Sequence, residues 1–272
     1  MTGGRIPILK NIMETINMKK IFVVIFILLT GWVFANADVY IKIKIHTDSR
    51  YYQGEIIPAE DSIEEIWIGD RKIVFITGRG LFHRLLNENQ TKIYDLENKL
   101  VSIIFPKNKI YAQSPLPLDR SKLLTDQYYS QLQMFKIKGI VRETDETKKI
   151  GKWNCKKYEL ETWIMDEGHR VVEKDISLWM TTEVPFDLDM YGKAAANERK
   201  LRDHRYDDDL ISEWNKIKGC QIALEMTSYY RGMARRYYEE VVEISEKNSP
   251  KNIYSVPPGY TRKERLSRQD FR

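Results

Sequence analysis

The feature that most constrains the fold of this chain is an alternation of apolar and polar residues with a period of two. In residues 39–46, which read VYIKIKIH, the odd positions are apolar and the even positions are mostly polar. Successive side chains of a β-strand point to opposite faces, so this alternation is typical of a half-buried strand. Similar runs occupy residues 63–68, 72–77, 91–96, 100–105, 109–113, 136–143, 154–165, 171–182, 220–229 and 235–244. About ten or eleven strands at hairpin spacing predict a large antiparallel sheet or barrel.

Two segments, Asp119–Phe135 and Ala196–Ile217, depart from this alternation. Their apolar residues recur every three or four positions, which is typical of an amphipathic helix. These residues are Leu124, Tyr128, Leu132 and Phe135 in the first segment, and Tyr206, Leu210, Trp214 and Ile217 in the second. Asp119 is a suitable N-cap. We therefore predict an α+β fold, a strongly curved antiparallel β-sheet or half-open β-barrel with two amphipathic helices covering its concave face.

The stretch TKKIGKWNCKKYEL, residues 147–160, raises the question of a basic binding loop. We predict that residues 144–149 and Gly151 form a polar hairpin turn and that residues 154–165 form the next strand. Tyr158 and Leu160 then share one face, and the lysines lie in the turn or on the outer face. This interpretation favours a solvated strand end over a basic site.

Cys155 and Cys220 are the two cysteines of the chain and form its candidate disulfide. A disulfide requires Cα atoms within about 7 Å. Cys155 shares parity with polar neighbours and Cys220 with apolar ones, and the strand 171–182 is expected between them, which separates them by about 10 Å. Cys220 lies at a strand start after Gly219, where parity is unreliable, so the sequence leaves the disulfide open. Neither cysteine has a neighbouring histidine, and no catalytic thiol is expected.

No pattern of catalytic or cofactor-binding residues emerges. The sequence has no G-x-S-x-G motif and no phosphate-binding glycine loop, and its four histidines are scattered. Residues 187–198 partly match a calcium-binding loop, but Tyr191 stands where an oxygen ligand is required and Pro185 interrupts the entering helix. We expect no enzyme activity, no catalytic residue, no metal and no cofactor.

The N-terminal region is typical of an export signal. From Met18 the chain reads MKKIFVVIFILLTGWVFANA, with a lysine pair, an apolar run and an A-x-A ending. The run is shorter than the roughly 20 residues of a membrane span, so cleavage after Ala37 is favoured over a retained anchor. Residues 1–17 resemble an upstream extension. We predict a periplasmic or otherwise exported protein of the bacterial cell envelope, with no stable membrane span after cleavage, a single β domain at 38–262, and a basic, disordered tail at 263–272.

The charge distribution argues against nucleic acid as a partner. The formal net charge is +5, but much of it lies in the N-terminal region and in the tail. No basic stripe with interleaved aromatic residues is present.

Three segments together resemble a known group of proteins. They are DLENKLVSIIFPKNKIYAQ (95–113), TKKIGKWNCKKYELE (147–161) and RYYEEVVEISEKNSPKNIYSVPPGYTR (236–262). Their order and spacing are similar to those of an uncharacterised family of exported bacterial proteins in the LolA-like (outer-membrane lipoprotein carrier-like) superfamily. The resemblance implies a half-open barrel with helices over its concave apolar face. Relatives of that fold hold acyl chains, lipoproteins or other hydrophobic ligands, or act as envelope sensors.

The preferred hypothesis is a periplasmic, non-enzymatic carrier for a lipid or lipoprotein acyl chain or another hydrophobic small molecule. The alternative is a protein-interaction or sensor module of the envelope, with a barrel filled by its own side chains and a protein as its partner. The residues expected to line a hydrophobic cavity are Ile41, Ile43, Leu124, Tyr128, Leu132, Tyr158, Leu160, Ile176, Leu178, Met180, Leu210, Trp214, Leu224 and Met226.

The export prediction has a direct test. N-terminal sequencing of the exported protein is expected to begin at Asp38, because the A-x-A sequence ends at Ala37. Recovery of a chain from membranes with Met18 intact would contradict it.

Overall fold

The computed structural model describes residues 37–52, 55–77, 90–133, 136–166, 168–202, 208–230 and 233–271. The chain divides into two units, Met1–Ala37 and Asp38–Arg272. The predicted signal peptide, Phe135, Tyr206 and the side chain of Leu132 lie outside the described residues. The description that follows concerns the second unit.

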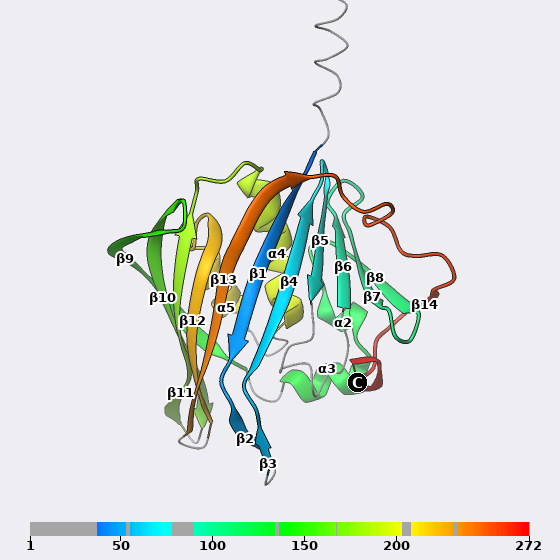
Figure 1. Ribbon diagram of the computed structural model, residues 1–272. Coiled ribbons are helices and arrows are strands. Elements are labelled where there is room, and N and C mark those ends of the chain that lie inside the picture. Colours follow the sequence, from blue (N-terminus) through cyan, green and yellow to red (C-terminus); the bar gives the residue numbers. More distant parts are fainter. Residues whose placement is uncertain are drawn as a thin grey trace, which may run out of the picture. The chain divides into compact units, whose positions relative to one another are not determined.

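This unit is built on a 12-stranded sheet in the order β14-β8-β7-β6-β5-β4-β1-β13-β12-β11-β10-β9 (Figure 1). The first group of strands is β1(Asp38–Thr47), β4(Glu60–Ile68), β5(Lys72–Thr77), β6(Gln90–Asp95), β7(Leu100–Phe105) and β8(Ile110–Pro115). The second is β9(Lys138–Ile150), β10(Trp153–Asp166), β11(His169–Thr181), β12(Cys220–Tyr230) and β13(Met233–Lys247). The edges are β14(Thr261–Lys263) and β9, which do not pair with each other in the described structure. The predicted curved sheet with helices is therefore confirmed, and the sheet is not a closed barrel.

Most predicted strands lie within a few residues of the observed ones, because alternation and turn residues determine them locally. The short hairpin of β2(Arg50–Tyr52) and β3(Glu55–Ile57) was not predicted, nor was β14. β14 runs parallel to β8, so the sheet is mixed instead of purely antiparallel. The predicted turn at residues 144–149 is wrong, because β9 continues to Ile150 and the turn consists of Gly151 and Lys152.

The sheet consists of two antiparallel meanders joined at its centre. The first meander is β1-β4-β5-β6-β7-β8, and the second is β13-β12-β11-β10-β9. β1 pairs with β4 on one side and, through Asp38↔Lys247 to Thr47↔Tyr237, with β13 on the other. The first and last long strands of the unit are thus neighbours. This pairing unites residues about two hundred positions apart, and local periodicity carries no information on it.

The first meander is covered on both faces, which explains its continuous apolar runs such as Ile73-Val74-Phe75. Ile73 and Phe75 belong to the cluster on the concave side, whereas Val74 belongs to a second cluster on the opposite side. There Tyr40, Trp67, Val74, Ile93 and Ile104 contact Ile253, Tyr254, Val256 and Tyr260 from the segment after β13. Burial on both faces replaces alternation by unbroken apolar runs.

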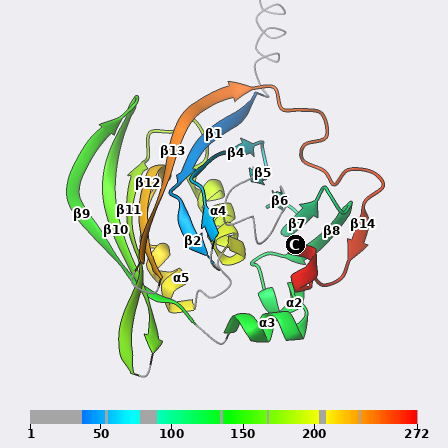
Figure 2. The ribbon, with the colours of Figure 1, turned by 60° about the horizontal axis from the view of Figure 1, so that its bottom comes forward.

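In the described part of the chain, four α-helices accompany the sheet: α2(Arg120–Leu123), α3(Asp126–Gln133), α4(Leu188–Arg202) and α5(Asp208–Trp214). The predicted helix at 119–135 is two short helices, and its predicted N-cap is confirmed, since the Asp119 side chain accepts a hydrogen bond from Ser121 N. The segment predicted at 196–217 corresponds to the end of α4 and all of α5. α4 and α5 lie within the curve of the sheet, and α2 and α3 lie near β8 (Figures 1 and 2). None of the described helices is long and apolar enough to cross a membrane.

The tail after residue 262 is folded, so the prediction of disorder there is wrong. Leu266 is fully buried in the main core. Arg265 donates hydrogen bonds to the carbonyl oxygens of Leu124 and Ser121 and pairs with Asp126. The 3-10 helix η2(Arg268–Phe271) follows, and Lys263 pairs with Asp270 within it. Basic composition suggested a solvated tail, but these cations bind carbonyl and carboxylate groups of the fold.

Gly219, which precedes β12, provides a test of the turn that enters this strand beside Thr181 of β11. Its φ is +98°, and an added Cβ would lie 2.4 Å from the carbonyl oxygen of Thr181. We expect Gly219→Ala to lower the free energy of unfolding by about 2 kcal/mol or more, measured by urea denaturation. Gly192 on α4 has open space around it, so Gly192→Ala is expected to raise stability by up to about 1 kcal/mol. Equal effects of the two substitutions would contradict the described turn.

Candidate functional site

The residues predicted to line a single cavity lie in two separate clusters. Ile41, Ile43 and Leu124, with the half-buried Tyr128 against them, belong to the main core cluster. The second cluster contains Tyr158, Leu160, Ile176, Leu178, Met180, Leu210, Trp214 and Leu224, with Met226 packed against it. Both clusters consist of buried side chains that contact one another. The concave face is therefore packed at both places, and we name the two regions the α4 cluster and the α5 cluster after the helices that cover them.

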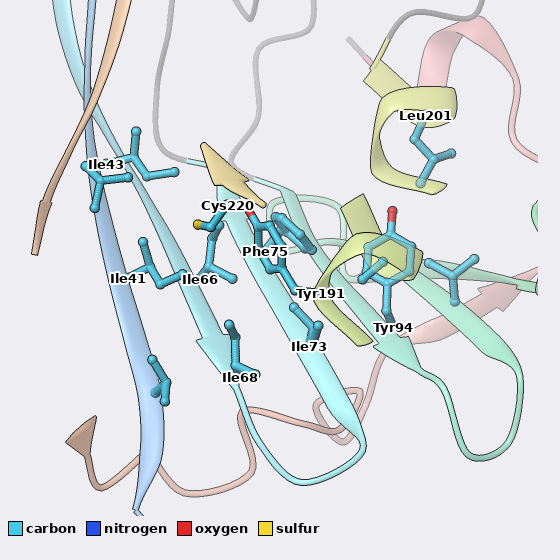
Figure 3. Packing of buried hydrophobic residues seen from close by; sticks show 14 of the residues in the cluster. Ile41, Ile43, Ile66, Ile68, Ile73, Phe75, Tyr94, Tyr191, Leu201 and Cys220 are labelled. Carbon is cyan, nitrogen blue, oxygen red and sulfur yellow. The ribbon is translucent and has the colours of Figure 1, made fainter. Parts of the chain in front are cut away.

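The α4 cluster lies between α4 and the first meander. The buried face of α4 carries Tyr191, Ala194, Glu198 and Leu201, at spacings of three, four and three residues. Figure 3 shows Tyr191 and Leu201 on the helix, with Phe75 and Tyr94 on the strands below. Burial raises the pKa of Tyr191 well above its ordinary value, so its hydroxyl is neutral.

A buried ion pair fixes α4 to the sheet. The Lys92 ammonium on β6 lies 2.6 Å from Oε1 of Glu198 on α4, and the two side chains are only 7% and 5% exposed. The Tyr94 hydroxyl donates to Oε2 of the same carboxylate at 2.8 Å. Each oxygen of Glu198 thus has a donor, which is what burial of a charged carboxylate requires. The arrangement positions the helix.

The same contacts explain the partial calcium-loop match. Asp187 accepts hydrogen bonds from the backbone N–H groups of Asp189 and Met190, as an N-cap does. Asp189 pairs with Lys193, and Glu198 pairs with Lys92. These residues form and anchor a helix. The described residues contain no group of three or more His, Cys, Asp or Glu side chains placed to hold a metal ion.

The α5 cluster is covered by a shorter helix with fewer anchors. Leu210 and Trp214, one turn apart, are the buried residues of α5. Glu213 accepts a hydrogen bond from Val141 N on the edge strand β9 at 2.9 Å. Hydrogen bonds from Lys216 and from Val141 N hold the pKa of Glu213 below its ordinary value. Ile211, which is half-buried, also packs against the cluster, and the Arg199 guanidinium of α4 lies 5.0 Å from the centroid of the Trp214 ring. In the described structure, α5 is therefore held by apolar packing, this ring contact and one peripheral carboxylate, and by no buried ion pair.

An open hollow of about 540 Å³ lies beside the α5 cluster. It is lined by Thr147, Lys148 and Lys149 of β9, by Asn154, Cys155, Lys156 and Tyr158 of β10, by Met180, Thr181 and Thr182, and by Lys218. Tyr158 and Met180 belong both to its wall and to the α5 cluster. The hollow thus has an apolar floor that continues into the packed cluster, and a rim that carries four lysines and no carboxylate.

The lysines of this rim have different partners. Lys156 pairs with Glu143. Lys149 lies near enough to Glu183 to help lower the pKa of that carboxyl, to which hydrogen bonds from Asn154 contribute most. The Lys148 ammonium lies 5.3 Å from the centroid of the Trp179 ring. Lys218 donates to the carbonyl oxygen of Asn215 at 3.3 Å. The prediction of a merely solvated strand end overlooked this shared hollow.

Both cysteines are free thiols, so the candidate disulfide is not formed. β11 lies between their strands, and Thr181 is the partner of Cys220. The prediction that Cys155 faces the polar side is wrong, because it is 2% exposed in the α4 cluster. The buried positions of β10 shift by one residue between Cys155 and Tyr158, where the register with β9 is irregular. Burial raises the pKa of both thiols, that of Cys220 to about 12.

Sequence reasoning missed Lys92 and Glu198 for different reasons. Lys92 lies on the same face of β6 as Tyr94. Both faces of this strand are buried, so the alternation of apolar and polar residues does not indicate that Lys92 points inward. Glu198 was placed near the start of a helix that in fact begins at Leu188. A signal was present in the spacing of Tyr191, Ala194, Glu198 and Leu201, which places a carboxylate on an apolar helix face.

No protein-family model matches the chain, and no curated protein matches it. Among solved structures it is similar to PNGF-II in the C2 and P21 crystal forms, with 12% and 13% identity and TM-scores of 0.36 and 0.38. These alignments cover 86% and 85% of this chain but 32% of PNGF-II, so the chain spans about a third of that protein.

A further similarity is to a DUF1329 family protein from Desulfovibrio piger ATCC 29098. The identity is 10% and the TM-score is 0.19, over 84% of this chain and 92% of that chain. TM-scores this low carry no argument about function. The resemblance to the LolA-like superfamily therefore stays a prediction.

The ion pair between α4 and β6 is tested by substitution. Glu198→Gln leaves the Lys92 ammonium buried without a counter-charge, so we expect the free energy of unfolding to fall by about 3–5 kcal/mol in urea denaturation. The double variant Lys92→Met, Glu198→Gln removes both charges and is expected to recover much of that loss. Equal stability of the wild type and Glu198→Gln would show that the pair is not buried as described.

Proposed function

We propose that this chain is a non-enzymatic binding protein of the bacterial envelope that holds a hydrophobic ligand. The ligand enters through the hollow and places its apolar part against the α5 cluster. The observation that carries the proposal is the continuity between the two, since Tyr158 and Met180 belong to both. The predicted export signal and the resemblance to lipoprotein carriers support the same assignment.

The hollow has the dimensions of a ligand site. Pockets for small molecules are commonly about 300–1,000 Å³ with mostly apolar walls and a few polar groups, and this one measures about 540 Å³. In the described structure the α5 cluster is closed by its own side chains. A long chain is therefore accommodated only when α5 moves outward, and its few anchors favour this motion. Leucine and methionine side chains repack readily around a guest of variable shape.

The energy of such binding suits reversible transport. Each buried methylene contributes about 0.8 kcal/mol, so a chain of about 16 carbons gains roughly 10 kcal/mol or more. Association and ordering cost about 4–15 kcal/mol. The difference allows binding that a partner protein can reverse, as a carrier requires.

The alternative function is a protein-interaction or sensor module with no small ligand. The complete burial of Leu210 and the close packing of the α5 cluster favour this alternative, because the protein's own side chains then fill the concave face and leave no space for a ligand. In that case the exposed edge strand β9 and the outer face of the second meander carry the function.

The two functions are separated by native mass spectrometry of the protein purified from a periplasmic fraction, with organic extraction in parallel. We expect a releasable adduct of lipid mass. A fatty acid with a photoreactive diazirine is expected to label peptides of the α5 cluster that contain Tyr158, Met180 or Trp214.

Ile73 and Phe75 of the α4 cluster serve as the internal control for labelling, because they lie under the anchored helix and do not line the hollow, whereas Cys155 of the same cluster does. A protein that stays free of adduct after incubation with fatty acids and phospholipids would overturn the carrier proposal in favour of the interaction module. Labelling of Ile73 and Phe75 equal to that of the α5 cluster would contradict the proposed place of binding.

A further inference from the structure

We infer that the hollow selects an anionic group, a carboxylate or a phosphate, carried at the end of an apolar chain, and that Lys148 and Lys218 contact it. This inference rests on the proposed function and specifies the chemical class of its ligand. It places the charged end of the ligand at the lysine rim and the apolar chain toward Tyr158 and Met180.

The rim of the hollow carries an excess of positive charge. Four ammonium groups line the hollow and no carboxylate does. The nearby carboxylates have their own partners, since Glu143 pairs with Lys156, and Glu183 accepts hydrogen bonds from Asn154 and lies near Lys149. An excess of two cations, those of Lys148 and Lys218, therefore remains at the opening.

The contacts of these two lysines leave them able to bind an anion. The Lys148 ammonium lies over the Trp179 ring, which holds its position without neutralising its charge. Lys218 donates to one carbonyl oxygen, that of Asn215, and an ammonium has three donors. Within the described part of the chain, neither lysine forms an ion pair with a carboxylate. They reach the hollow from β9 and from the segment between α5 and β12, so an anion between them receives donors from two sides.

The remaining wall supports the same orientation. Thr147, Thr182 and Asn154 add polar side chains at the rim. Deeper in the hollow, Met180 is buried, and so is the ring of Tyr158. An amphiphile with one charged end matches this gradient from cationic rim to apolar floor, whereas a neutral chain leaves the lysines without a partner.

The test measures binding of three probes by isothermal titration calorimetry at low salt: laurate, 1-dodecanol and inorganic phosphate. Laurate and dodecanol have chains of equal length and differ in the charged end. We expect laurate to bind at least about tenfold more tightly, as charge-assisted hydrogen bonds to two ammonium groups provide. The preference is expected to shrink as salt is raised, because the rim is exposed to solvent.

The variant is Lys148→Gln, Lys218→Gln, and its matched control is Lys193→Gln, which removes an exposed lysine of α4 outside the hollow. The double variant is expected to bind dodecanol unchanged and to reduce the preference for laurate to less than about threefold. The control is expected to retain the full preference. Unchanged dodecanol binding also shows that the double variant is folded.

The other outcomes separate this inference from the proposed function. Equal affinity of wild type for laurate and dodecanol would overturn the anion inference while the carrier proposal survives. A preference for laurate that persists in the double variant would overturn the role of these two lysines. If phosphate binds but neither laurate nor dodecanol does, both the amphiphile inference and the carrier proposal are overturned. The same holds if none of the three probes binds.

Discussion

The ion pair of Lys92 with Glu198 is the constraint on which the arrangement of this unit depends. It joins the first meander to α4, which lies in the sequence between β11 and β12 of the second meander. The two residues of the pair are 106 positions apart in the sequence. The pairing of β1 with β13 joins the same two halves through backbone hydrogen bonds. The first contact determines which face of the sheet α4 covers, and the second determines the order of the strands. Together they leave the concave face under α4 closed.

The second half of the concave face is held differently, and this asymmetry gives the account of function its physical basis. α4 is anchored by a buried charge pair and a stripe of apolar residues. In the described structure α5 has no buried charge pair, and it is held by apolar packing of Leu210, Ile211 and Trp214, by the Arg199 contact with the Trp214 ring and by the peripheral bond from Val141 N to Glu213. The hollow with its lysine rim lies beside the α5 cluster, with which it shares Tyr158 and Met180. Segments with few buried contacts open at low free energy, so α5 is the natural cover for a ligand site.

The sequence predicted the strands well, because each is determined by alternation and by the turn that follows it. It predicted less of the site. The strand order rests on β1 meeting β13, and no local pattern encodes that meeting. Cys155 was assigned to the wrong face because strict alternation was carried through an irregular register in β10. The lysines of residues 147–160 were predicted to lie in a turn or on an outer face, whereas Lys148 and Lys149 belong to β9, and their meeting with Lys218 depends on tertiary structure.

Hydrogen exchange measured by mass spectrometry shows directly whether α5 is a mobile cover and α4 a fixed one. We expect amides of residues 208–214 to exchange markedly faster than those of residues 188–202, because opening α5 exposes no buried charge pair. We also expect a bound amphiphile to slow exchange in residues 208–214 while leaving residues 188–202 nearly unchanged. Equal exchange of the two helices, with no response of α5 to the ligand, would contradict the account.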